Sequence, residues 1–248
     1  DYSDVVVGSA LGSSLGQIGF VLGLVGLLSY LTLPTGVIYR HGSTLLGSLL
    51  LIALFGYDGE VTRAEGVALL LVYTIYLVAL LTEINGNDGI DQPGNMPMRR
   101  SLVYLGIGLV VVVGSAELTV SSAVSVAQVL GLSDAVVAVI LIGLGSSLPE
   151  LSISVAAVMK GHHHLSVGNL IGSNVFDTLV PIGAAAVIAP LSVNRGMLLF
   201  ELPYLFFVTA LVLFFFVHQR GIQRWEAAVV LALYCVYVFA RLTGSLFF

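Results

Sequence analysis

Long runs of apolar residues recur along the chain, and short breaks rich in polar residues, glycine or proline separate them. A run of roughly 20 apolar residues can cross a bilayer as a helix, whereas the strands of a membrane barrel alternate apolar and polar residues. Segments 45–55 and 205–217 show no such alternation. The pattern predicts eight transmembrane helices, the second and last of them short, at residues 5–30, 43–55, 64–81, 101–130, 135–159, 165–188, 197–217 and 225–240.

Composition agrees with a membrane location. The 248 residues are 58% hydrophobic and 9% charged, whereas about a quarter of the residues of a soluble domain are charged. The net charge is −5 and no block of lysine or arginine exists, which argues against nucleic-acid binding and against a polybasic lipid anchor. The expected fold class is an all-α membrane protein surrounded by the lipid bilayer.

The longest polar stretch, residues 84–100, divides the predicted spans into three and five. Its asparagine, aspartate and glycine residues are typical of a flexible linker. When loops are assigned alternately to the two sides of the membrane, six basic residues share the side of this linker and three lie opposite, which favours a cytoplasmic linker in a plasma (inner) membrane. The six are Arg40, Arg99, Arg100, Lys160, Arg220 and Arg224, and the three are Arg63, Arg195 and Arg241.

An internal repeat relates the first predicted span to the sixth. Residues 5–24 and 165–184 share five identities at a constant offset of 160. Because the two spans are five apart, an odd number, the copies must run in opposite directions across the membrane. Inverted repeats of this kind place a transporter's substrate near the bilayer midplane, at interrupted helices, and we expect the interruptions at the Gly-Ser pairs. The identities are Val7/Val167, Gly8/Gly168, Gly12/Gly172, Ser13/Ser173 and Gly23/Gly183.

The repeat predicts the domain organisation. Residues 1–83 hold three helices of a first repeat, residues 84–100 form the linker, and residues 101–248 hold the five helices of a second repeat. The fourth and fifth spans have no counterparts before Asp1. The hypothesis is an inverted-repeat transporter bundle of five plus five helices, of which this chain has eight of ten and lacks two N-terminal helices.

An acidic residue follows a predicted helix break in the fifth span. Pro149 removes a backbone donor and biases the residue before it away from helical geometry. Glu150 could simply form a capping box with Ser147. A carboxylate at membrane depth costs about 2.5–3.5 kcal/mol on insertion scales, however, and such residues commonly mark an ion path.

A second acid, Asp177, lies twelve residues into the sixth span. Two acids at similar depth on neighbouring antiparallel helices could share one site. Calcium takes about six to eight oxygen ligands from carboxylates, hydroxyls and carbonyls. The predicted metal ligands are Glu150, Asp177, Ser146, Ser147 and Ser173. A further acid, Glu117 in the fourth span, is interpreted as a residue that pairs with a neighbouring helix or lines a cavity.

Two motifs carry a family resemblance. GSSLPE at residues 145–150 and GNLIGSNVFD at residues 168–177 closely resemble the second repeat motif of the cation/calcium antiporter superfamily, whose best-known branch is the sodium/calcium exchangers. The resemblance implies ten helices in two inverted repeats, with one GTSLPE-like helix per repeat donating a glutamate to a central calcium site. It implies that Glu150 is one such glutamate, with Ser146 and Ser147 beside it, and that Ser173 and Asp177 complete the sodium sites.

In the first repeat, Ser13 and Gln17 occupy the positions equivalent to Ser173 and Asp177, and the resemblance implies that they complete a set of seven metal-site residues. Members of the superfamily commonly carry asparagine or an acid where Gln17 stands, so this departure leaves ion stoichiometry and selectivity open. The other GTSLPE-like motif, with its glutamate, is absent from the chain.

The predicted function is antiport of calcium for sodium by alternating access, with both ions as transported substrates and no organic cofactor. A proton-coupled exchanger of the same fold is an alternative, although proton-coupled relatives tend to lack an acid at the position of Asp177. An intramembrane hydrolase with Ser147 as nucleophile is a second alternative, but we expect every histidine to lie in or beside a loop, away from Ser147. A non-transporting subunit is a third, and it would leave Glu150 and Asp177 without a role.

Overall fold

The computed structural model describes residues 2–84, 97–129 and 143–243. They form helices joined by short connections, four of which contain a two-residue strand. The helices are α1 (Tyr2–Leu15), η1 (Gly16–Val21), α2 (Leu22–Leu28), α3 (Thr35–Phe55), α4 (Arg63–Ile84), α5 (Met98–Val129), α7 (Gly143–Ser146), α8 (Leu148–Met159), α9 (His163–Ile188), η3 (Met197–Glu201), α10 (Leu202–Gln219) and α11 (Arg224–Thr243). The strands are β1 (Leu31–Thr32), β2 (Glu60–Val61), β3 (Leu191–Ser192) and β4 (Gly221–Ile222).

The apolar runs form helices as predicted. Within the described ranges, six helices are long and apolar enough to cross a membrane: Val6–Leu28, Thr35–Phe55, Arg63–Thr82, Arg99–Thr119, His163–Ile188 and Met197–Gln219. The prediction that the second and last spans are short was wrong, because α3 has 21 residues and α11 has 20. Residues 135–142 of the predicted fifth span lie outside the described residues.

The early start of α3 has a physical explanation. Arg40 and His41 suggested a loop, but both lie inside the helix. The His41 ring forms a 2.6 Å hydrogen bond with the Tyr76 hydroxyl of α4, and an arginine near a helix end can extend its charged group toward the membrane surface. A polar side chain that has a hydrogen-bond partner or reaches the membrane surface does not end a transmembrane helix.

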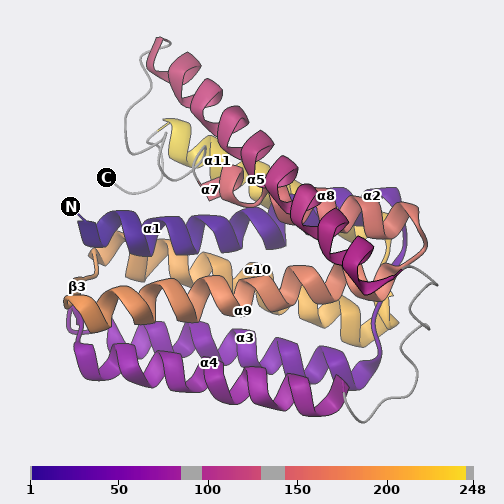
Figure 1. The fold of residues 1–248 in the computed structure, drawn as a ribbon. Coiled ribbons are helices and arrows are strands. Elements are labelled where there is room, and N and C mark those ends of the chain that lie inside the picture. The colour runs from indigo at the N-terminus through magenta and orange to yellow at the C-terminus, as the bar shows by residue number, and fades with distance from the viewer. Residues whose placement is uncertain (1, 85–96, 130–142, 244–248) are drawn as a thin grey trace.

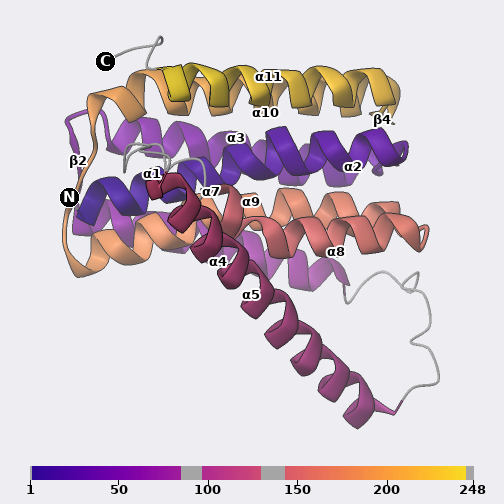
Figure 2. The same ribbon diagram turned by 90° about the horizontal axis from the view of Figure 1, so that it is seen from above.

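Helix α9 lies at the centre of the bundle and packs against α1, α3, α4 and α8, while α11 packs along α2 (Figure 1). Helix α5 crosses the bundle obliquely, and its Met98 end projects beyond the other helices (Figure 2). Its contacts with α7 and α8 place it next to the break between those two helices.

The strand pairs show the inverted repeat directly. Strand β1 pairs with β4 and β2 pairs with β3, both antiparallel. Leu31 lies opposite Ile222 and Leu191 lies opposite Val61. Because Leu191 follows Leu31 by 160 residues and Ile222 follows Val61 by 161, exchanging the two repeats converts one strand pair into the other.

The expected interruptions at the Gly-Ser pairs were wrong. Helix α9 continues through Gly172 and Ser173, and α1 continues through Gly12 and Ser13. In lipid each unsatisfied backbone group costs several kcal/mol, so a helix keeps its hydrogen bonds unless proline removes one. The first span instead changes to a π-helix at Gly16–Val21, a local widening that is frequent at functional sites.

Gly23 and Gly183, one of the matched pairs of glycines, lie at helix crossing points. A Cβ atom on Gly183 of α9 would lie 3.0 Å from the carbonyl oxygen of Gly66 in α4. In the other repeat, a Cβ atom on Gly23 of α2 would lie 3.2 Å from the carbonyl oxygen of Ala227 in α11. Small residues allow membrane helices to approach closely, and this explains why glycine occurs at the same point of both copies.

We predict that Gly183→Val destabilises the fold by about 1–3 kcal/mol, because overpacking forces α4 and α9 apart. The measurement is thermal unfolding in detergent. Gly106→Val on α5 is the matched control, since a Cβ atom there would meet nothing within 4 Å. Equal loss of stability in both variants would contradict the crossing-point interpretation.

Candidate cation-binding site

The predicted helix break lies between α7 and α8. Helix α7 ends at Ser146, α8 begins at Leu148, and Pro149 stands in the first turn of α8. The capping box, the alternative explanation for the position of Glu150, is not formed, because the Ser147 side chain makes no capping hydrogen bond to α8. Its hydroxyl instead lies 3.3 Å from the hydroxyl and 3.3 Å from the carbonyl oxygen of Ser13 in α1. The break therefore directs Ser147 toward the opposite repeat.

Asp177 of α9 is held by the equivalent region of the first repeat. Its Oδ2 atom accepts hydrogen bonds from the Ser13 hydroxyl at 2.9 Å and from the Gln17 amide nitrogen at 2.8 Å. Gln17 lies in the π-helix η1. Gln17 and Asp177, whose positions are related by the 160-residue offset, thus contact each other through their side chains.

The Gln17 amide has a fixed orientation. Its oxygen accepts hydrogen bonds from the Ser173 hydroxyl at 2.8 Å and from the Asn174 amide nitrogen at 2.7 Å. The same Asn174 nitrogen donates to the Leu170 carbonyl at 2.7 Å. Because a carbonyl oxygen only accepts hydrogen bonds, the Asn174 atom that contacts Leu170 must be the amide nitrogen. This nitrogen also contacts Gln17, so the Gln17 atom facing Asn174 must be the amide oxygen, and the Gln17 nitrogen must face Asp177. Gln17 and Asn174 are fully buried, whereas Ser173 and Asp177 are partly buried.

Glu150 adds a second carboxylate from the first turn of α8. Its Oε2 atom is buried and has no hydrogen-bond partner among the described residues. The carboxylate lies within electrostatic reach of Asp177. Burying an ionised carboxylate without a partner is costly, so the arrangement requires a cation or a proton to neutralise it.

Another buried acid shows how a structural carboxylate differs. Glu201 of η3 forms an ion pair with Arg241 of α11. Within the described ranges, no such pair with arginine, lysine or histidine involves Glu150 or Asp177. The charge of Glu201 is compensated by the protein itself, whereas the two site carboxylates have no basic partner in the part of the chain that the structure describes.

The donor set suits a hard cation. No group of three or more histidine, cysteine, aspartate or glutamate side chains that could hold a metal occurs in the part of the chain that the structure describes. The site offers instead carboxylate and hydroxyl oxygens, which calcium and sodium prefer over the nitrogen and sulfur ligands of transition metals.

Most of the predicted site residues come together. Five of the seven are linked by hydrogen bonds and Glu150 adjoins them, whereas Ser146 is exposed at the end of α7. The prediction omitted Asn174, although its place in the GSN triplet and its helical spacing from Leu170 could have indicated a buried polar residue. The five linked residues are Ser13, Gln17, Ser147, Ser173 and Asp177.

Two further expectations were wrong. His41 does not lie in or beside a loop but is buried in α3, where Tyr76 satisfies its ring nitrogen. Glu117 is exposed on α5 instead of lying against a neighbouring described helix or cavity, since the apolar part of α5 is exposed throughout.

The model of the family described as sodium/calcium exchanger protein matches residues 1–82 and 100–243. The chain belongs to this family. The match includes both halves of the site described above, and it confirms the resemblance carried by the GSSLPE and GNLIGSNVFD motifs. The family consists of transporters.

Several relatives are similar over most of the chain. The putative antiporter CaxA of Alkalimonas amylolytica is 35% identical over 200 residues, which cover 75% of this chain and 61% of CaxA. An uncharacterized membrane protein of Methanocaldococcus jannaschii is 33% identical over 94% of this chain and 75% of its own length. The sodium/calcium exchanger MaX1 of Methanosarcina acetivorans is 26% identical, with 95% and 79% covered. The chain thus spans about three-fifths of CaxA and more of the other two.

The fold matches a solved exchanger. A structure of the sodium-calcium exchanger NCX_Mj, soaked with sodium and calcium, superposes with a TM-score of 0.79 at 30% identity. The match covers 96% of this chain and 76% of that protein. The chain therefore has the all-α, inverted-repeat exchanger fold.

We predict that Gln17→Glu lowers thermal stability in the presence of a chelator, because a carboxylate would replace the donor that faces Asp177. Two like charges 4 Å apart repel by about 4 kcal/mol at an effective dielectric constant of about 20. Added calcium should restore more stability to this variant than to the wild type.

Gln17→Met is the control, since it removes the same hydrogen bonds without adding charge. Its unfolding temperature should fall, but calcium should not rescue it beyond the wild-type response. An equal calcium response in the two variants would show that Gln17 does not face a cation-accessible carboxylate.

Proposed function

We propose that the protein is a secondary antiporter that exchanges calcium for sodium across a membrane by alternating access. The observation that carries this proposal is the buried Oε2 atom of Glu150, which has no hydrogen-bond partner among the described residues and lies within electrostatic reach of Asp177. Two carboxylates in a bilayer that have no basic partner in the described ranges form a site whose stability depends on a cation.

Competition for the same oxygens would couple the two ions. One calcium ion neutralises both carboxylates at once, whereas sodium must neutralise them one charge at a time. A site that remains charged is costly to close off from water. The switch between inward-open and outward-open states is therefore favoured only when calcium or sodium fills the site, and this links the movement of one ion to that of the other.

The source of the ligands supports alternating access. Ser13 and Gln17 come from the first repeat copy, whereas Ser173 and Asp177 come from a helix that runs in the opposite direction. Ser147 and Glu150 come from a broken helix next to them. Small movements of these elements relative to one another can open the same site to either side of the membrane.

Proton coupling is the second candidate, and Gln17 favours it. The Ser13 hydroxyl and the Gln17 amide already satisfy Oδ2 of Asp177 without a bound ion. A neutral amide that presents its nitrogen leaves fewer oxygens for sodium than a carboxylate would. Glu150, which lacks a described partner, is then the group that would carry a proton in exchange for calcium.

The domain division and the orientation are part of the proposal. The strand pairs, with their offsets of 160 and 161 residues, support a first repeat at residues 1–83 and a second at residues 101–248. The excess of basic residues on one side supports a cytoplasmic linker at residues 84–100 in the plasma (inner) membrane.

The test is calcium uptake into liposomes that contain the protein, with either an outward sodium gradient or an outward proton gradient. We expect the sodium gradient to drive uptake and the proton gradient to have little effect. Uptake driven only by protons would replace sodium by protons in the proposal. Absence of uptake under both gradients, in liposomes shown to contain folded protein, would reject antiport of calcium.

We predict that Glu150→Gln and Asp177→Asn each reduce the apparent calcium affinity in this assay by about tenfold or more, which corresponds to about 1.4 kcal/mol. Each substitution keeps the size of the side chain and removes one of the two charges that calcium would neutralise. Glu117→Gln is the matched control, because Glu117 is exposed on α5. Unchanged uptake by both site variants would remove these residues from the mechanism.

A further inference from the structure

Helix α8 carries Glu150 and begins directly after the break at Ser147. Because the helix is interrupted there, α7 and α8 do not form one rigid rod. Glu150 lies within electrostatic reach of Asp177, and two carboxylates repel each other when no cation lies between them. The position of Glu150 therefore depends on what holds α8 against α9.

A buried hydrogen bond joins these two helices. The Asn169 amide nitrogen of α9 donates to the Ser154 hydroxyl of α8 at 3.3 Å. Ser154 is fully buried, and its hydroxyl donates to the Ser166 carbonyl oxygen at 3.5 Å. Because a carbonyl oxygen only accepts, the Ser154 hydrogen is used in that contact, and Asn169 must present its nitrogen to the Ser154 oxygen.

This hydrogen bond lies one helical turn from the cation site. Ser154 follows Glu150 by four residues, and Asn169 precedes Ser173 by four residues. Residues four apart lie on the same face of a helix, about 6 Å along its axis. Helices α8 and α9 lie side by side and run antiparallel (Figure 2). The contact that places Ser154 opposite Asn169 therefore also places Glu150 opposite Ser173.

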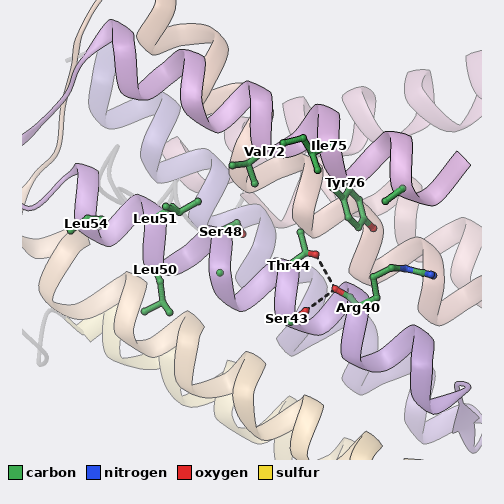
Figure 3. Close-up of a pocket in the computed structure, with 12 residues that line it drawn as sticks. Arg40, Ser43, Thr44, Ser48, Leu50, Leu51, Leu54, Val72, Ile75 and Tyr76 are labelled. Carbon is green, nitrogen blue, oxygen red and sulfur yellow. Dashed lines mark hydrogen bonds between the residues drawn. The ribbon is translucent and has the colours of Figure 1, made fainter. Parts of the chain in front are cut away.

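Helix α9 is itself fixed to the first repeat. The Ser173 hydroxyl lies 2.8 Å from both the Asn169 carbonyl oxygen and the Gln17 amide oxygen. The Thr178 hydroxyl lies 3.1 Å from the hydroxyl of Ser48 on α3, in the lining of the groove between α3 and α4 (Figure 3). Asn169 thus connects α8 to a helix that is already held in place.

The other end of α8 is held by the turn into α9. The Gly161 amide bonds to the Val158 carbonyl oxygen at 2.9 Å, and the His162 amide bonds to the Ala157 carbonyl oxygen at 2.8 Å. Gly161 has a φ of 80°, as the residue after a helix C-cap has in a Schellman motif. Between this turn and the break, the bond from Asn169 to Ser154 keeps the Glu150 end of α8 close to α9.

We propose that Asn169 and Ser154 are positioning residues that set the preference of the site for divalent over monovalent cations. The inference rests on the proposed function, because it takes Glu150 and Asp177 as the carboxylates that bind the transported ions. Calcium takes about six to eight oxygen ligands and uses both carboxylates at once, so its affinity depends on the distance between them. A sodium ion needs only one carboxylate, so its affinity depends on that distance much less.

The first repeat offers a matched control. Ser9 precedes Asn169 by 160 residues. Its hydroxyl donates to the Val6 carbonyl oxygen of its own helix at 3.1 Å, rather than to a neighbouring described helix. Ser9→Ala therefore removes a polar group from the equivalent position without removing a contact between helices.

The test is binding of calcium alone and of sodium alone to the purified protein in detergent, measured by the rise in unfolding temperature with ion concentration. Ser154→Ala and Asn169→Leu should each weaken calcium binding by about threefold to tenfold, the range for loss of one neutral hydrogen bond. Sodium binding should change much less, and Ser9→Ala should leave the affinity for both ions unchanged.

The double variant tests whether the two residues act through one contact. Because both substitutions remove the same hydrogen bond, the double variant should bind calcium about as weakly as the weaker single variant. Unchanged calcium affinity in the single variants would overturn the proposal. Equal loss of calcium and sodium affinity would also overturn it, because a general loss of structure has that effect. Ser154→Ala removes only one oxygen atom, so it carries the test if Asn169→Leu does not fold.

Binding is measured without an ion gradient, so the result is separate from that of the uptake assay. A protein that shows the expected calcium-selective loss but no gradient-driven uptake would reject the proposed antiport and support the positioning role. A wild-type protein that binds no calcium would overturn both.

Discussion

The carboxylate of Asp177 must find partners inside a bilayer, and the centre of the structure follows from that requirement. Ser13 and Gln17 donate to it, and Ser173 and Asn174 hold Gln17 in the orientation that allows this. Hydrogen-bond donors from uncharged groups reduce the cost of a buried anion without cancelling its charge. The remaining charge, like that of Glu150, has no basic partner among the described residues, whereas the charge of Glu201 is paired with Arg241.

The symmetry of the two repeats supplies the partners of Asp177 from the equivalent region of the first repeat. A residue at one position of the first repeat meets its equivalent in the second because the copies run antiparallel and cross at the site. At two other contacts, Gly23 and Gly183 remove side chains and allow α2 to approach α11 and α9 to approach α4 closely. The same sequence pattern therefore sets both the distance between helices and the pairing of Gln17 with Asp177.

Sequence reasoning was strongest where one physical effect dominates. The apolar runs predicted the spans, Pro149 predicted the break before α8, and the offset of 160 predicted that Ser13 and Gln17 would meet the second repeat. It failed where a tertiary contact decides the outcome. Arg40 and His41 read as a loop because Tyr76, the partner of His41, is 35 residues away. Nothing in the local sequence indicates the π-helix that carries Gln17.

The two small strand pairs have a mechanical consequence. Strand β1 comes from the first repeat and β4 from the second, and the same holds for β2 and β3. Each pair fastens a loop of one half to a loop of the other, one pair for each surface of the membrane. The two pairs therefore tie the halves together at both ends of the bundle. The oblique α5, which packs beside the broken helix, contributes to neither strand pair.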